Sequence, residues 1–131
     1  MTENQISKEV LDAAFKVHTK LGPGLLESAY QECLFYEIKK KGFGIEKEYP
    51  LPLEYENVQL DVGYRIDLLV EKKFVVEIKS VESINDVHLA QILTYLKLSD
   101  IKLGLLLNFN VARLKHGIKR VINSRVKNSG I

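Results

Sequence analysis

The segment "YRIDLLVEKKFVVEIKS" (Tyr64–Ser80) decides the fold, because it has the pattern of two short β-strands joined by a tight turn. Its alternating apolar residues are Ile66, Leu68, Val70, Phe74, Val76 and Ile78. Three charged residues, Asp67, Glu77 and Lys79, lie inside these apolar runs, where burying charge is costly. The hairpin therefore carries a charge pattern that its fold alone does not require.

The turn determines which charged residues meet. Glu77 and Lys79 are two apart on a strand, so they project from the same face. If Glu71–Lys73 is a three-residue loop, Asp67 lies directly opposite Glu77, and Arg65 lies opposite Lys79. Directly opposed Cβ atoms are ~5 Å apart, and like charges there are destabilising. We therefore expect a cation between the two carboxylates.

Mg²⁺ or Mn²⁺ suits a pair of carboxylates at this separation, because both ions prefer oxygen ligands. Lys79 would stand beside the attacking water or the charge that develops on a phosphate. These are the parts needed for metal-assisted phosphodiester hydrolysis. The alternative interpretation is a solvent-facing strand face on which Asp67, Glu77 and Lys79 form only a salt-bridge cluster.

Downstream, a third helix is predicted from a cap at Asn85 or Asp86 to about Leu98. "LGLLLNF" (Leu103–Phe109) is an apolar run of strand length. A helix between the hairpin and this strand implies a crossover, and hence a mixed sheet. The following "VARLKHGIKRVIN" is either a last strand or a short helix.

Upstream, an amphipathic helix ends at Gly22, and a second helix runs from about Leu25 to Lys41. Residues 45–56 then alternate between apolar and polar, which indicates a strand with one wet face. Its two prolines confine it to a sheet edge or a bulge. The order helix, helix, three strands, helix, strand predicts an α/β fold with a mixed central sheet flanked by helices.

The 131 residues fit one domain, which we expect to span 1–131. "MTENQISKEV" has no apolar core of a secretory signal, and the longest apolar run is too short to cross a membrane. The single cysteine, Cys33, excludes an internal disulfide and is typical of a protein of the reducing cytoplasm.

Charge is unevenly placed. Residues 1–100 have a net charge of −5 and residues 101–131 a net charge of +7, which together give +2. The basic segment 101–131 indicates an anionic partner such as nucleic acid. The alternative is a solvated basic terminus that helps solubility.

Two further stretches add polar groups to the hairpin. In "GLLESAY", Glu27 lies on the flank of the apolar stripe of the second helix, so its carboxylate can reach toward the sheet. In "HLAQILTYL", His88, Gln91 and Tyr95 form a polar ridge on the third helix. The alternative is a half-buried helix whose polar side chains make only local hydrogen bonds.

Together these motifs resemble the GxxExxY family, a branch of the PD-(D/E)XK nuclease superfamily. The residues that carry the resemblance are Gly24, Glu27, Tyr30, Asp67, Glu77, Ile78, Lys79, Gln91 and Tyr95. The resemblance implies a restriction-endonuclease-like αβββαβ core, to which this chain adds one N-terminal helix. The superfamily's namesake proline is replaced by Ile66.

The resemblance also implies roles. Asp67 and Glu77 would be metal ligands, with the main-chain carbonyl of Ile78 as a third and Glu27 contacting the metal or its water. Lys79 would orient or activate water and neutralise charge in the transition state.

Gln91 and Tyr95 match the QxxxY motif of the RecB-like branch, where they position substrate and lysine. Phosphate contacts are expected from the basic residues and the histidine near the site or in the basic segment, namely Arg65, His88, Arg113, Lys115, Lys119 and Arg120.

The sequence thus predicts a Mg²⁺- or Mn²⁺-dependent nuclease acting on nucleic acid, DNA rather than RNA. An alternative is a catalytically silent nucleic-acid-binding or accessory module that retains the nuclease fold. A third is a structural protein with a salt-bridged strand face. Because the chain is too small for a separate recognition domain, target choice would depend on a protein partner or on homo-oligomerisation.

Overall fold

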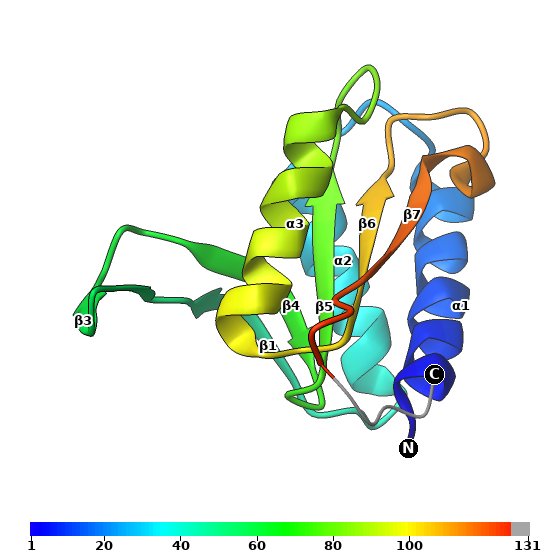
Figure 1. Ribbon diagram of the computed structural model, residues 1–131. Coiled ribbons are helices and arrows are strands. Elements are labelled where there is room, and N and C mark those ends of the chain that lie inside the picture. Colours follow the sequence, from blue (N-terminus) through cyan, green and yellow to red (C-terminus); the bar gives the residue numbers. More distant parts are fainter. Residues whose placement is uncertain (127–131) are drawn as a thin grey trace.

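The computed structural model describes residues 1–126 and consists of three α-helices, one 3₁₀ helix and seven strands (Figure 1). The basic segment and the expected domain both extend to Ile131, beyond the described residues. The elements are α1 (Glu3–Leu21), α2 (Glu27–Lys40), β1 (Ile45–Pro50), β2 (Leu53–Tyr55), β3 (Val58–Leu60), β4 (Arg65–Val70), β5 (Phe74–Lys79), α3 (Asp86–Ser99), β6 (Leu103–Asn108), η1 (Leu114–Gly117) and β7 (Ile118–Ile122).

Five strands form the central sheet in the order β1-β4-β5-β6-β7. Strands β5 and β6 are parallel and the other neighbours are antiparallel. The mixed sheet and the crossover through α3 confirm the predicted α/β fold. The described helices include none that is long and apolar enough to cross a membrane.

The hairpin register is the predicted one. Strands β4 and β5 pair Val70 with Phe74 and Leu68 with Val76, which leaves the three-residue loop Glu71–Lys73. Both Glu71 and Lys72 have positive φ angles.

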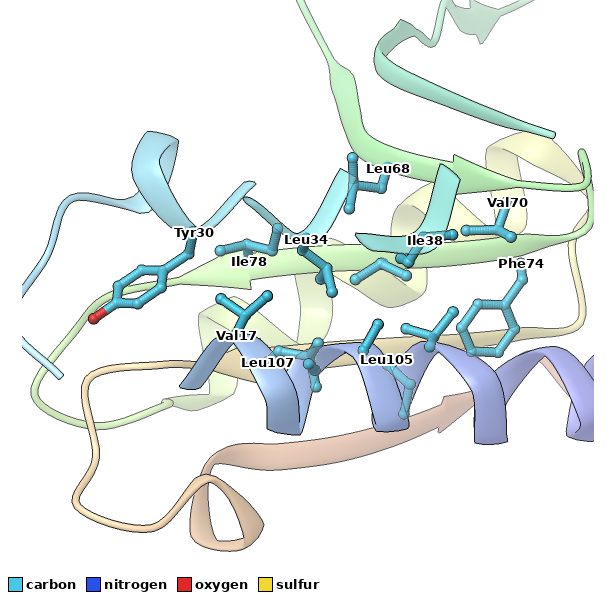
Figure 2. Close-up of a cluster of buried hydrophobic side chains, with 14 of the residues drawn as sticks. Val17, Tyr30, Leu34, Ile38, Leu68, Val70, Phe74, Ile78, Leu105 and Leu107 are labelled. Atoms are coloured by element: carbon cyan, nitrogen blue, oxygen red, sulfur yellow. The ribbon is translucent and has the colours of Figure 1, made fainter. Parts of the chain in front are cut away.

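The helices cover the two faces of the sheet (Figure 1). Helices α1 and α2 bury one face in the larger apolar cluster, and Figure 2 shows Val17, Leu34 and Leu105 pointing into the space between these helices and the sheet. Helix α3 buries the other face with Ile92, Tyr95 and Leu96.

One expectation needs correction, and one open alternative is resolved. The predicted strand over residues 45–56 is broken after Pro50, and its second half pairs with β3 in a separate two-stranded hairpin. The break follows from proline, which cannot donate to a ladder. The tail that was ambiguous forms both elements, the 3₁₀ helix η1 and then the edge strand β7.

Candidate active site

Asp67 on β4 and Glu77 on β5 lie on the face of the sheet that α3 covers, and each carboxylate bonds to the backbone of the opposite strand. Glu77 Oε2 accepts a hydrogen bond from the Asp67 N–H at 2.8 Å. Asp67 Oδ2 accepts one from the Ile78 N–H, also at 2.8 Å. The two side chains meet across the hairpin, as its register predicts.

These bonds end the regular pairing of the two strands. The last regular pair is Leu68 with Val76, because the carboxylates take the next backbone donors. The expected pair of Arg65 with Lys79 is therefore not formed. Arg65 pairs with Pro50 on β1, and its Nη1 donates to the Tyr64 carbonyl at 2.8 Å.

Burial makes both carboxyl groups harder to ionise, because it raises their pKa values. Burial raises the pKa of Asp67 to about 6, with the charges of Glu48 and Glu27 adding to the increase and the Ile78 N–H opposing it. Glu77 is only 4% exposed, and burial followed by the Asp67 charge raises its pKa well above the ordinary value. The pair therefore needs a proton or a cation near neutral pH.

Lys79 lies at the end of β5 and is connected to α3. Its Nζ donates to Gln91 Oε1 at 3.3 Å, and Gln91 Nε2 donates to the Tyr95 hydroxyl at 3.3 Å. Burial, together with the charges of Glu77 and Asp67, raises the pKa of Tyr95. The structure thus brings the predicted lysine and two residues of the polar ridge, Gln91 and Tyr95, into one hydrogen-bonded network.

A hollow of about 240 Å³ lies beside the hydrogen-bonded side chains of Gln91 and Tyr95. Its lining includes Gln91 and Tyr95, together with the aromatic ring of Tyr64 and the exposed Val87. Tyr64 and Tyr95 pack with ring centroids 5.7 Å apart. The polar and aromatic part of this lining is therefore one amide, that of Gln91, and two phenol rings.

Glu27 comes from the opposite layer, as the first residue of α2, and reaches the end of β5. Its Oε2 accepts a hydrogen bond from the Ser80 N–H at 3.2 Å. Ser80 Oγ in turn donates to the Leu25 carbonyl at 2.6 Å. The glutamate therefore reaches the sheet, as its helical position predicts, but on the residue after Lys79.

Tyr30 has a role that the sequence did not reveal. Its hydroxyl donates to the Gly22 carbonyl and accepts from the Leu25 N–H, so it fixes the loop that leads into α2. Its ring stacks on Phe109 at 4.6 Å between centroids. Gly24 in the same loop has a φ of 99°, which favours glycine. Two residues of the GxxExxY pattern thus position the third, Glu27.

Glu48 is a second residue that the sequence did not single out. It lies on β1 between the paired residues Lys47 and Tyr49, has no ladder partner, and has a φ of 53°. The register places it opposite Asp67, and its charge raises the pKa of both buried acids. Alternation alone gave it the same status as every other exposed glutamate of the strand.

Within residues 1–126, no three Asp, Glu, His or Cys side chains lie close enough together to hold a metal ion. The expected convergence of Glu27 with Asp67 and Glu77 is therefore incomplete, because Glu27 is bonded to Ser80. The donor chemistry of the pair still fits a divalent cation, since two buried carboxylates of raised pKa are relieved by positive charge.

The structure does not bring the other predicted nucleic-acid contacts to the acid pair. The His88 ring accepts a hydrogen bond from the Asn85 N–H and belongs to the capping box of α3. Arg113 and Lys115 line an open hollow of about 570 Å³ at the end of α1. Lys119 and Arg120 are exposed on β7, which β6 separates from β5.

Comparison with known proteins identifies the family. No curated protein and no solved structure matches the chain significantly. The family model of the PD-(D/E)XK nuclease superfamily matches residues 4–121, a range that contains the carboxylate pair, Lys79 and all three α-helices except the first residue of α1. Because this match covers far more than half of the sequence, the chain belongs to the PD-(D/E)XK nuclease superfamily.

Proposed function

We propose that this chain is a Mg²⁺- or Mn²⁺-dependent nuclease of the GxxExxY type that hydrolyses phosphodiester bonds in nucleic acid, DNA rather than RNA. The observation that carries the proposal is the buried pair Asp67–Glu77 with Lys79 on the same face. Such a pair destabilises a fold unless a cation neutralises it. We also propose that residues 1–131 form one domain.

Asp67, Glu77 and the Ile78 carbonyl would hold the ion, with Glu27 approaching from α2. When bound, the ion would supply Lewis-acid stabilisation of the negative charge on the reacting phosphate.

Besides the metal ion, the side chain of Lys79 supplies a positive charge to the site. Its ammonium can donate to a phosphate oxygen and to the attacking water, because only one of its three donors is used by Gln91 in the described residues. The Gln91 carbonyl holds the ammonium in place, and the Tyr95 hydroxyl fixes the orientation of the Gln91 amide. Such positioning lowers the barrier without further movement during the reaction.

Phosphate contacts outside the acid pair are assigned to Arg65, His88, Arg113, Lys115, Lys119 and Arg120. The exposure of Arg113 just before η1, of Lys115 on η1 and of Lys119 and Arg120 on β7 supports the last four of these contacts. Contacts of this kind give affinity without sequence preference.

A second candidate is a nucleic-acid-binding or accessory module without turnover. Within residues 1–126 no third acidic, histidine or cysteine side chain is placed to hold a metal ion together with the pair, which favours this candidate. This module would bind nucleic acid in a salt-dependent manner, without metal dependence and without loss of binding on Asp67→Asn.

The experiment measures cleavage of single-stranded DNA, duplex DNA and RNA with Mg²⁺, Mn²⁺ or EDTA. Asp67→Asn, Glu77→Gln and Lys79→Met are each expected to lower the metal-dependent rate by ~100-fold or more. Asp12→Asn and Lys8→Met, exposed on α1, are the matched controls. Metal-dependent cleavage that survives all three site variants contradicts the proposal.

Metal binding is measured separately through the melting temperature. A site that binds Mn²⁺ raises it, and Asp67→Asn removes the rise. If the melting temperature is the same with and without the ion, the structural interpretation of the charged strand face is supported instead.

A further inference from the structure

The hairpin β2–β3, residues 53–60, projects from the body of the molecule and is called the arm below (Figure 1). Its strands pair with each other and pack extensively on no other described helix or strand. Glu56 and Asn57 both have positive φ angles, as in the two-residue turns that suit a twisted hairpin. The arm is therefore a regular element without support from the core.

One face of the arm is apolar. Leu53 lies opposite Leu60, and Tyr55 lies opposite Val58, so all four project from the same face. Tyr55 is 62% exposed, Val58 55% and Leu60 41%. An isolated two-stranded hairpin is marginally stable in water, and an exposed apolar face of this kind marks an interaction site.

The charge of the arm excludes a phosphate backbone as its partner. Glu54 and Glu56 are acidic, Asp61 follows the arm directly, and no lysine or arginine occurs between residues 51 and 64. The partner must therefore combine apolar surface with positive charge.

A surface of that kind lies on the outer side of α2. Two hollows of about 250 and 460 Å³ share Glu32 and Tyr36 and form what we call the α2 groove. Cys33 and Tyr36 contribute to the first hollow, and Phe35 and Tyr36 to the second.

Lysines form the rim of the α2 groove. Lys39 lies over the Phe35 ring at 5.6 Å, and Lys40 lies over the Tyr36 ring at 5.1 Å. Lys40 is paired with Glu37, whereas Lys39 has no carboxylate within 4.0 Å among the described residues. Lys39 is thus a cation available to an acidic partner.

We propose that the arm of one copy lies in the α2 groove of a second copy, and that the second arm returns to the first groove in a closed two-fold dimer. The arm is acidic and apolar, the groove is basic and apolar, and the arm extends away from its own body (Figure 1). Arm-to-arm packing would instead bring like charges together. Reciprocal exchange closes the assembly at two chains. This proposal does not depend on nuclease activity.

The first test is the oligomeric state of the full chain, measured by sedimentation velocity from about 1 to about 200 µM, a range that brackets weak to moderate association. A concentration-dependent dimer is expected. Val58→Lys weakens it by ~10-fold or more, because a charge enters the apolar contact. The matched control is Val87→Lys, since Val87 is 75% exposed and lies on α3 outside both surfaces. Circular dichroism establishes that both variants fold.

The second test exchanges charges. Lys39→Glu and Glu56→Lys, the latter in the turn at the tip of the arm, are each expected to weaken the dimer several-fold, and the double variant restores it. Lys8→Glu on α1 controls for net charge. A chain that stays monomeric throughout, a dimer unaffected by Val58→Lys, or a double variant no better than the single ones each overturns the proposal. A heterologous protein on the arm would give the first of these results.

Discussion

At the scale of residues, the Asp67–Glu77 pair makes the free energy of unfolding depend on pH in an unusual direction. The folded protein holds the Asp67 proton more tightly than the unfolded chain does, because the pKa rises from 3.8 to about 6. Without metal, this contribution to stability is therefore greatest at acidic pH and declines as pH rises from about 4 through about 6. The raised pKa of Glu77 acts in the same direction.

The substitution Asp67→Asn tests this dependence. In EDTA at pH 8, we expect it to raise the free energy of unfolding by ~1–3 kcal/mol, since the amide oxygen can still accept the Ile78 N–H and the buried charge is gone. At pH 4 the difference should vanish. Urea denaturation at both values measures it, with Asp12→Asn as the control. Equal stability of wild type and Asp67→Asn at pH 8 would contradict the assigned pKa.

Single residues also show which parts of the site could be predicted from the sequence and which could not. Strand periodicity was sufficient to place Asp67, Glu77 and Lys79 on one face. It did not reveal Glu48, because a left-handed backbone in the middle of a strand leaves no trace in the alternation. The hydrogen bond of Glu27 to Ser80 depends on where two distant segments meet, which spacing along one helix does not specify.

At the scale of elements, α3 carries two residues of the site and starts at a side-chain cap. Asn85 accepts the His88 N–H at 3.0 Å, and the His88 ring accepts the Asn85 N–H. Asn85→Ala is expected to lower the free energy of unfolding by ~1 kcal/mol, because backbone donors of the first turn lose their partner. Chemical denaturation measures the loss. Ser83→Ala, in the preceding loop, should have no comparable effect.

The 3₁₀ helix η1 depends on a glycine. A Cβ at Gly117 would overlap the Asn108 carbonyl. Asn108 is itself held in place, because its side chain accepts a hydrogen bond from the Val81 N–H and donates one to the Val81 carbonyl. Gly117→Ala should therefore cost ~2 kcal/mol or more through a forced backbone shift. A thermal melt measures it. A melting temperature equal to that of wild type would show that the approach is not tight.

Helix limits were predictable within about two residues, because burial along one face gives a clear 3.6-residue period. The prediction of a single strand over residues 45–56 depended on alternation alone, and it was wrong because alternation does not show where a strand leaves the sheet. Alternation records which residues share a face, and the arm keeps alternating after it has left the sheet. Its apolar face has no partner within the described chain, so no local pattern distinguishes it from β1.

At the scale of the whole molecule, the arm and the body are separable. The Leu51 N–H donates to the Tyr64 carbonyl at 2.9 Å, and this pair continues the register of β1 with β4. Replacing Pro52–Gly63 by Asn-Gly should close a two-residue hairpin and change the free energy of unfolding by less than ~1 kcal/mol. Denaturation measures this, and a loss of several kcal/mol would mean that the arm supports the core.

The two packed faces of the sheet give the molecule two compartments that differ in size. Among residues 1–126, eighteen buried apolar residues fill the side of α1 and α2, and nine fill the side of α3, where the acid pair lies. Leu106 and Leu107 are consecutive, yet they belong to different compartments. Alternate residues of β6 therefore pack on opposite sides of the sheet, one in the larger compartment and the next in the compartment that contains the acid pair. Substitutions in the α3 compartment can therefore change what binds there, while the larger compartment keeps the chain folded.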